Sequence, residues 1–288
     1  MIGKRWAAAA LAIGWGAGGV LGEVRGQEAE PAYRSPYRVE FTRPIGELIG
    51  DLERTERGDR KLEADMPHAR WYSEATRERW KAWGPAARHY PPLEGIGSWS
   101  VERKRERVVA VAMRYLGYGY QHHHIPDWDP PADWPWLTTC VGSNGKGVDC
   151  SNLTGFVYNQ GFGLRLNTDI ARQAEARTAP ETDNRVPVRL HEVTLPAAYP
   201  DRIAALRTGD LLYIKSLKGE VSHVVVWIGP IGRSPDGTPL ILDSHGSGVR
   251  DSENHLIPCG VHLRPFRENS WYNKSASHAL RIFPDREG

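Results

Sequence analysis

Two short runs rich in β-branched residues constrain the fold of this 288-residue chain more than any other feature. They read GDLLYIKS at 209–216 and SHVVVWIGP at 222–230, and the segment between them is short and contains a glycine. This spacing predicts a β-hairpin. A third run, PLILDSHG at 239–246, follows a turn signal, and HALRIFP at 278–284 closes the series. The C-terminal half is therefore expected to form an antiparallel sheet.

Two helices are expected before these strands. In SVERKRERVVAVAMRYLG, apolar residues recur at three- and four-residue steps, with Ser100 as a suitable N-cap and Gly117 as a C-cap. In DCSNLTGFVYNQG, Asp149 stands near the N-cap and Gly161 at the end. Helices followed by a run of antiparallel strands predict an α+β domain.

The N-terminus has the pattern of a targeting segment. A basic start, MIGKR, precedes a short apolar, small-residue stretch, so residues 1–26 are interpreted as a cleaved signal peptide. An uncleaved N-terminal anchor is the alternative. No cysteine lies near the end of this segment, which excludes a lipid-modified mature terminus. We expect an exported protein of the periplasm, cell envelope or exterior, with a helical or irregular extension at 27–98 and the main domain at 99–288.

The charge balance bears on the partners of the chain. The formal net charge is +2, and no long basic stripe is present, so nucleic acid is not an expected partner. Once the signal peptide is removed, no stable membrane insertion is expected. The sequence leaves the oligomeric state open.

Three cysteines, Cys140, Cys150 and Cys259, are an odd number for an exported protein. One reading pairs Cys140 with Cys259 as a disulfide and leaves Cys150 free. A free thiol outside the cytosol is a liability unless it is buried or used. Cys150 is therefore a packing residue, half of a disulfide, or a nucleophile.

The nucleophile reading rests on the position of Cys150 at a helix start. Backbone N–H groups and the helix dipole favour the thiolate there, and a histidine is then needed as base. His223 opens a strand, where alternation puts it on one face with Val225 and Trp227. His245 ends the next strand and can lie beside His223 to orient its ring. The alternative is that Cys150 only packs in the core and that both histidines are solvated or satisfied elsewhere.

The order of these segments resembles the NlpC/P60 family of papain-like cysteine peptidases. The segments that carry the likeness are GVDCSNLTGFVYNQGFG, GDLLYI, SHVVVWIG and ILDSHGSG. Upstream, AMRYLGYGYQ is similar to a family segment whose last tyrosine maps onto Tyr120, and LNTDIARQAEA is a weaker match. The likeness covers about 100–284 and implies a catalytic helix packed on an antiparallel sheet.

The resemblance also implies roles. Cys150 is the nucleophile, His223 the general base and His245 the orienting third member, while Tyr120 donates to the oxyanion or positions the substrate. The reaction is hydrolysis of an amide in peptidoglycan stem peptides, of the D-glutamyl–diamino-acid endopeptidase type, without a cofactor. Two alternatives remain: an N-acetylmuramoyl-L-alanine amidase or other thiol acyl-transfer enzyme on the same fold, and a catalytically inactive wall-binding protein.

Substrate contacts are expected from both sides of the cysteine. Asp149 and Ser151 are candidates for binding a substrate amine. A long loop at 121–147, rich in Trp and Pro, is expected to reshape or cap the cleft, with Trp128 and His122 lining it.

The chain departs from the family pattern in three places. Asn152 stands where the family favours glycine, the 121–147 loop is longer than usual, and a second insertion spans 178–202. All three bear on local packing and on the choice of substrate.

The three adjacent histidines at 122–124 raise the question of a metal. Alternate side chains of an extended segment face opposite ways, so only His122 and His124 can share an ion, with Asp127 or Asp129 as third ligand. We expect no metal site and a cleft-lining or structural role for these rings.

Overall fold

The computed structural model describes residues 33–53, 74–81, 90–120, 147–179, 187–246 and 248–285. The predicted signal peptide, most of the 121–147 loop with Trp128 and His122, and Cys140 lie outside these residues. Ala32–Gly288 form one structural unit. Within the described parts of the chain, no helix is long and apolar enough to cross a bilayer.

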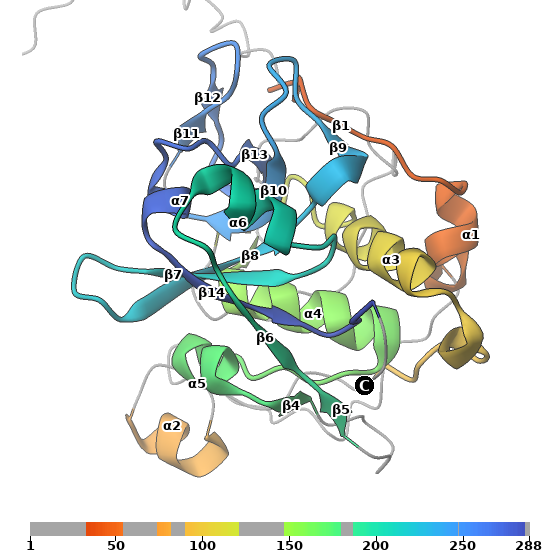
Figure 1. Cartoon of the computed structure of the whole chain (residues 1–288). Helices are drawn as coiled ribbons and strands as arrows, with labels where there is room; N and C mark the ends of the chain where they lie inside the picture. The colour runs from red at the N-terminus through yellow and green to blue at the C-terminus, as the bar shows by residue number, and fades with distance from the viewer. Residues whose placement is uncertain are drawn as a thin grey trace, which may run out of the picture. The chain divides into compact units, whose positions relative to one another are not determined.

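A six-stranded antiparallel sheet forms the centre of the molecule (Figure 1). Its strands, in spatial order, are β13 (Gly260–Pro265), β10 (Leu240–His245), β8 (Val221–Trp227), β7 (Leu211–Lys215), β14 (Ala276–Arg281) and β6 (His191–Thr194). The predicted hairpin is β7–β8, and Gly219 takes a φ of +84° in its turn. The antiparallel sheet expected from the sequence is confirmed, although β13 and β6 had not been predicted.

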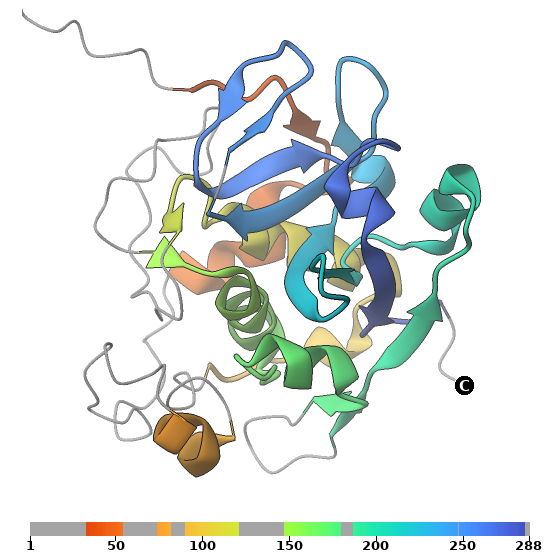
Figure 2. The same cartoon turned by 90° about the vertical axis from the view of Figure 1, so that its left-hand side faces the viewer.

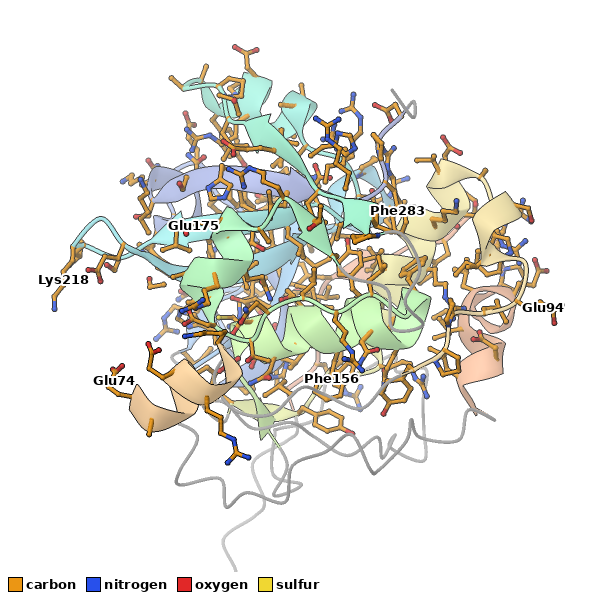
Figure 3. The ribbon with its side chains drawn as sticks, turned by 90° about the horizontal axis from the view of Figure 1, so that it is seen from below. Glu74, Glu94, Phe156, Glu175, Lys218 and Phe283 are labelled. Carbon is orange, nitrogen blue, oxygen red and sulfur yellow. The ribbon has the colours of Figure 1, made fainter. Side chains whose placement is uncertain are left out.

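Helix α4 (Cys150–Phe162) covers one face of the sheet, where it packs against β8 and β10. The other long helix, α3 (Val101–Met113), packs against α4. Val224 and Val226 of β8, and Ile228 directly after it, point into the core on this side. Figure 2 views α4 nearly end-on, and Figure 3 shows Phe156 on α4 and Lys218 at the far tip of the β7–β8 turn.

The opposite face of the sheet carries a second core. It lies under α6 (Tyr199–Ala205) and α7 (Trp271–Lys274) and includes Val225 and the fully buried Trp227. The alternation predicted for β8 is therefore correct. It matters for the site because His223 belongs to the same set of alternate residues and faces α7.

The remaining elements are short. They are β1 (Arg38–Val39), α1 (Ile45–Ile49), η1 (Gly50–Glu53), α2 (Glu74–Trp80), η4 (Ile96–Ser98), β2 (Gly119–Tyr120), β3 (Gly147–Val148), α5 (Ile170–Glu175), β4 (Thr178–Ala179), β5 (Val188–Arg189), η5 (Gly229–Ile231), β9 (Gly232–Arg233), β11 (Val249–Arg250) and β12 (Leu256–Ile257). The second insertion thus contributes β4, β5 and α6, together with β6 at the edge of the sheet.

Both long helices begin where the sequence predicts. The Ser100 side chain accepts a hydrogen bond from the backbone N–H of Arg103, and Asp149 caps α4 in the same way. Their ends differ from the prediction. Helix α3 ends at Met113, before Gly117, because three tighter turns follow it. Helix α4 continues past Gly161 to Gly163, whose φ of +68° closes it.

Part of the N-terminal extension belongs to the main core. Leu48 and Ile49 of α1 are fully buried in the cluster that α3 and α4 form. Arg107 of α3 is also buried, and its two terminal nitrogens pair with the two carboxylate oxygens of Asp51 at 2.7 and 2.8 Å. This bidentate pair and the apolar contacts fix the extension to α3.

One glycine joins the sheet to the segment before the site. Gly260, with a φ of +105°, starts β13, and a side chain there would come within 2.0 Å of the Tyr118 carbonyl oxygen. The close approach allows Val261 to exchange backbone hydrogen bonds with Gly117 and Tyr118. The chain is thereby held at Tyr120, which pairs with Val148 just before the start of α4.

Candidate active site

Cys150 is the first residue of α4 and follows a well-made N-cap. Asp149 Oδ1 accepts a hydrogen bond from the Asn152 backbone N–H at 2.8 Å, and the Ser151 hydroxyl donates to the Thr168 carbonyl at 2.7 Å. Asp149 and Ser151 are both buried. Both side chains hydrogen-bond within the protein, Asp149 to the start of α4 and Ser151 to Asp149 and the Thr168 carbonyl.

The thiol of Cys150 lies against the backbone at the start of β8. The backbone N–H groups of Val224 and Ser151 hydrogen-bond its sulfur. Burial and then the nearby Asp149 charge nevertheless raise the pKa of the Cys150 thiol above its usual range. The thiol is therefore protonated at rest, and a base is required to activate it.

The His223 ring is held by a buried carboxylate. Its Nε2 lies 2.7 Å from Asp243 Oδ2, which also accepts a hydrogen bond from the Tyr272 hydroxyl at 2.8 Å. Asp243 Oδ1 accepts from Arg264 Nε at 2.6 Å. Burial alone would raise the pKa of the Asp243 carboxyl, but the Arg264 charge and the His223 hydrogen bond hold it well below its usual range. The Asp243 carboxylate is therefore ionised and accepts a hydrogen bond from Nε2–H of His223. Nδ1 is then the ring nitrogen that can accept a proton.

The partner of His223 differs from the expectation. His245 was expected to orient the ring, and it does lie beside it, with ring centroids 5.0 Å apart and planes at 82°. The group that accepts a hydrogen bond from Nε2, however, is the Asp243 carboxylate, two residues earlier on the same face of β10. Asp243, Arg264 and Tyr272 were not identified from the sequence, although a charged residue inside the apolar strand LILDSH was a usable signal.

The start of α4 lies against β8 beside the backbone of His223, because the backbone N–H of the next residue, Val224, hydrogen-bonds the Cys150 sulfur. Helix α4 packs against β8 and β10, and the Asp243 charge acts on the Cys150 thiol. Among the residues that the structure describes, no hydrogen bond joins the Cys150 sulfur to a ring nitrogen of His223. Catalytic hydrogen bonds are often long without substrate and tighten in the complex.

Tyr120 lies at the mouth of the site. Its ring packs next to Gly246, where an added side chain would meet the ring at 3.2 Å, and 38 % of the residue is exposed. Burial, followed by the neighbouring Cys150 and Asp149, raises the pKa of Tyr120 to about 12. Its hydroxyl therefore keeps its proton at neutral pH.

The structure describes only some of the other candidate residues. Cys259 is a free thiol that donates to the Gly246 carbonyl at 3.2 Å. Its predicted disulfide partner, Cys140, lies outside the described residues, as do Trp128, His122 and the histidines and aspartates of the metal alternative. Among the described residues, no three His, Cys, Asp or Glu side chains gather in a group that could hold a metal ion.

Comparisons with known proteins agree with the motifs. Residues 139–277 match the NlpC/P60 family. Two similar solved structures are an NlpC/P60 family protein from Bacillus cereus ATCC 10987 and the NlpC/P60 domain of the peptidoglycan hydrolase SagA. The first is 17% identical with a TM-score of 0.33, and the match covers 65% of this chain and 41% of that chain.

The SagA domain is 19% identical with a TM-score of 0.34, and the match covers 62% of this chain and 98% of the domain. No curated protein matches the chain. The family match spans α4, β7, β8 and β10, which carry Cys150, His223 and Asp243. The chain therefore contains a domain of the NlpC/P60 family.

Proposed function

We propose that this protein is a cysteine peptidase that hydrolyses an amide bond in bacterial cell-wall peptides, of the D-glutamyl–diamino-acid endopeptidase type. The observation that carries the proposal is the buried His223–Asp243 pair, 2.7 Å apart, next to the cysteine that begins α4. Membership of a family that includes the peptidoglycan hydrolase SagA supports the substrate class.

The first half of the reaction forms an acyl-enzyme. His223 Nδ1 takes the proton of the Cys150 thiol while Nε2–H stays bonded to the Asp243 carboxylate. The sulfur attacks the amide carbonyl carbon, and a new C–S bond forms as the carbonyl oxygen becomes an oxyanion. His223 then gives its proton to the amide nitrogen, the C–N bond breaks, and the amine leaves.

The second half restores the enzyme. His223, again neutral, takes a proton from a water molecule, whose oxygen attacks the thioester carbon. The C–S bond breaks, the acid is released, and the proton returns to the Cys150 sulfur. Asp243 remains ionised throughout and stabilises the imidazolium that forms in each half.

Oxyanion stabilisation falls to the helix start and to Tyr120. The backbone N–H of Cys150 lies at the positive end of α4, and the Tyr120 hydroxyl keeps its proton because its pKa is about 12. A single oxyanion donor contributes about 3 kcal/mol in well-characterised enzymes.

The proposed setting is outside the cytoplasm. The proposal includes the predicted signal peptide at 1–26 and export to the periplasm, cell envelope or exterior, where stem peptides are found. The expected Cys140–Cys259 disulfide is not part of the proposal, because Cys259 is a free thiol in the structure.

Digestion of purified muropeptides by the full chain, with the products weighed by mass spectrometry, tests the bond that is cut. The proposal predicts fragments cut after the D-glutamyl residue. Release of an intact stem peptide from the muramoyl group would instead make the protein an amidase, and unchanged muropeptides would make it a non-catalytic binder.

A further inference from the structure

A cavity of about 650 Å³ opens next to the candidate active site. It lies between the end of β10 and the segment that leads into α7. The described residues of its wall include His245, Arg267, Asn269, Ser270, Trp271 and Tyr272. None of them has been given a part in the reaction except Tyr272, which bonds Asp243.

The cavity begins on the imidazole side of the site. The ring of His223 lies 5.0 Å from that of His245, 5.6 Å from that of Trp271 and 6.0 Å from that of Tyr272, measured between centroids. These three rings are therefore both the neighbours of the base and the near wall of the cavity.

The position of the cavity indicates which half of the substrate it can bind. His223 must protonate the nitrogen of the leaving amine, so the leaving group lies on the imidazole side of the scissile bond. The acyl half is the half that becomes bonded to the Cys150 sulfur. A cavity walled by the neighbours of His223 therefore faces the leaving group.

The charge of the cavity wall indicates which chemical group of a ligand it can bind. Arg267 is the one permanently charged residue among the described wall residues, and no ion pair with a described carboxylate involves it. Its Nη1 donates to the Arg250 carbonyl at 3.0 Å, which fixes the guanidinium and leaves its charge uncompensated by that contact. The Ser234 hydroxyl donates a hydrogen bond to the Asp236 carboxylate at 2.7 Å. This bond and, to a smaller extent, the Arg267 charge lower the pKa of Asp236.

We propose that this cavity binds the leaving-group half of a peptide substrate and that Arg267 pairs with a carboxylate on it. A guanidinium matches a carboxylate in a bidentate pair, and the Trp271 ring offers a flat apolar surface for the intervening chain. The inference rests on the proposed function for the direction of the substrate, and it narrows the substrate to peptides with a free carboxylate close to the cut on its C-terminal side.

A binding measurement tests the inference without requiring turnover. Lysyl-alanine with a free carboxylate and its carboxamide are titrated calorimetrically into the full chain carrying Cys150→Ala. We expect the acid to bind at least about tenfold more tightly than the amide, and Arg267→Met to remove most of that difference. Arg250→Met is the matched control, because its backbone carbonyl still holds Arg267 and its side chain does not line the cavity.

Equal affinity for the two peptides, or a preference that survives Arg267→Met in a folded variant, would overturn the inference. Thermal melting of each variant establishes that it is folded. The readouts separate the two proposals. Charge-dependent binding through Arg267 without any muropeptide cleavage would contradict the proposed function alone, and cleavage without the carboxylate preference would contradict the cavity assignment alone.

Discussion

His223 Nε2 and Asp243 Oδ2 lie 2.7 Å apart inside the protein, where neither residue is more than 5 % exposed. The pair fixes the imidazole with Nδ1 free to act as base. The family resemblance implied that His245 would orient this ring, but the group that bonds Nε2 is a carboxylate on the same face of β10.

Asp243→Asn should therefore damage catalysis far more than His245→Gln. The amide of asparagine no longer stabilises the imidazolium and can favour the other tautomer, so we expect kcat to fall by about 100-fold or more. His245→Gln should cost less than about tenfold, because the His245 ring lies edge-on to that of His223, whose Nε2 bonds Asp243. Steady-state kinetics on a stem peptide measures both, and the reverse order of effects would return the orienting role to His245.

Arg264→Met should destabilise the fold through Asp243. The substitution leaves a buried carboxylate without its strongest cationic partner, which typically costs about 3–5 kcal/mol of unfolding free energy. Adding Asp243→Asn removes the orphaned charge, so the double variant should regain part of the loss. Urea denaturation of the single and double variants checks this, and simple additivity of the two losses would contradict a direct charge pair.

Asp149→Asn should make the Cys150 thiol more reactive. Asparagine keeps a side-chain oxygen for the N-cap but removes the charge that raises the pKa of Cys150. The pKa of the thiol should therefore fall, and alkylation by iodoacetamide at neutral pH should be faster. Peptide mapping separates Cys150 from the other two cysteines, and a rate equal to or slower than that of the wild type would refute the electrostatic effect of Asp149.

His262 should make the fold sensitive to acid. Burial, and then the Arg264 charge, lower the pKa of His262 to about 3, so the unfolded chain binds this proton more readily than the folded one. The stabilisation that the neutral His262 ring contributes is fully present above the unfolded pKa of about 6.5. As the pH drops from there toward 3, the free energy of unfolding falls by up to about 1.4 kcal/mol per pH unit.

Denaturation curves at pH 7 and pH 4.5 compare wild type with His262→Leu. The variant should lose less stability between the two pH values. An equal loss in both proteins would mean that His262 does not contribute to the acid response.

Local sequence signals predict the elements that carry the site but not their contacts. Helix α4, its cap at Asp149 and the alternation of His223, Val225 and Trp227 depend on neighbours in the sequence, so they can be predicted. The partner of His223 depends on the register between β10 and β8, in which Ile241 pairs with Trp227. That register follows from packing across the sheet.

The contact between Arg264 and Asp243 is even harder to predict from the local sequence. It comes from β13, a strand that the sequence did not indicate, which pairs with β10 so that Arg264 lies opposite Ile241. A buried arginine is rare because its charge must be paired, and the pairing residue lies 21 positions away in the chain. The charge network behind His223 therefore emerges only from the assembled sheet.

The rate of stem-peptide hydrolysis by Cys150→Ala, compared with wild type under the same conditions, tests the central claim most directly. The alanine variant keeps the His223–Asp243 pair, and its fold can be checked by circular dichroism. The thiol mechanism predicts that hydrolysis falls to the background rate. Hydrolysis by the folded variant at the wild-type rate would contradict the assignment of Cys150 as the nucleophile.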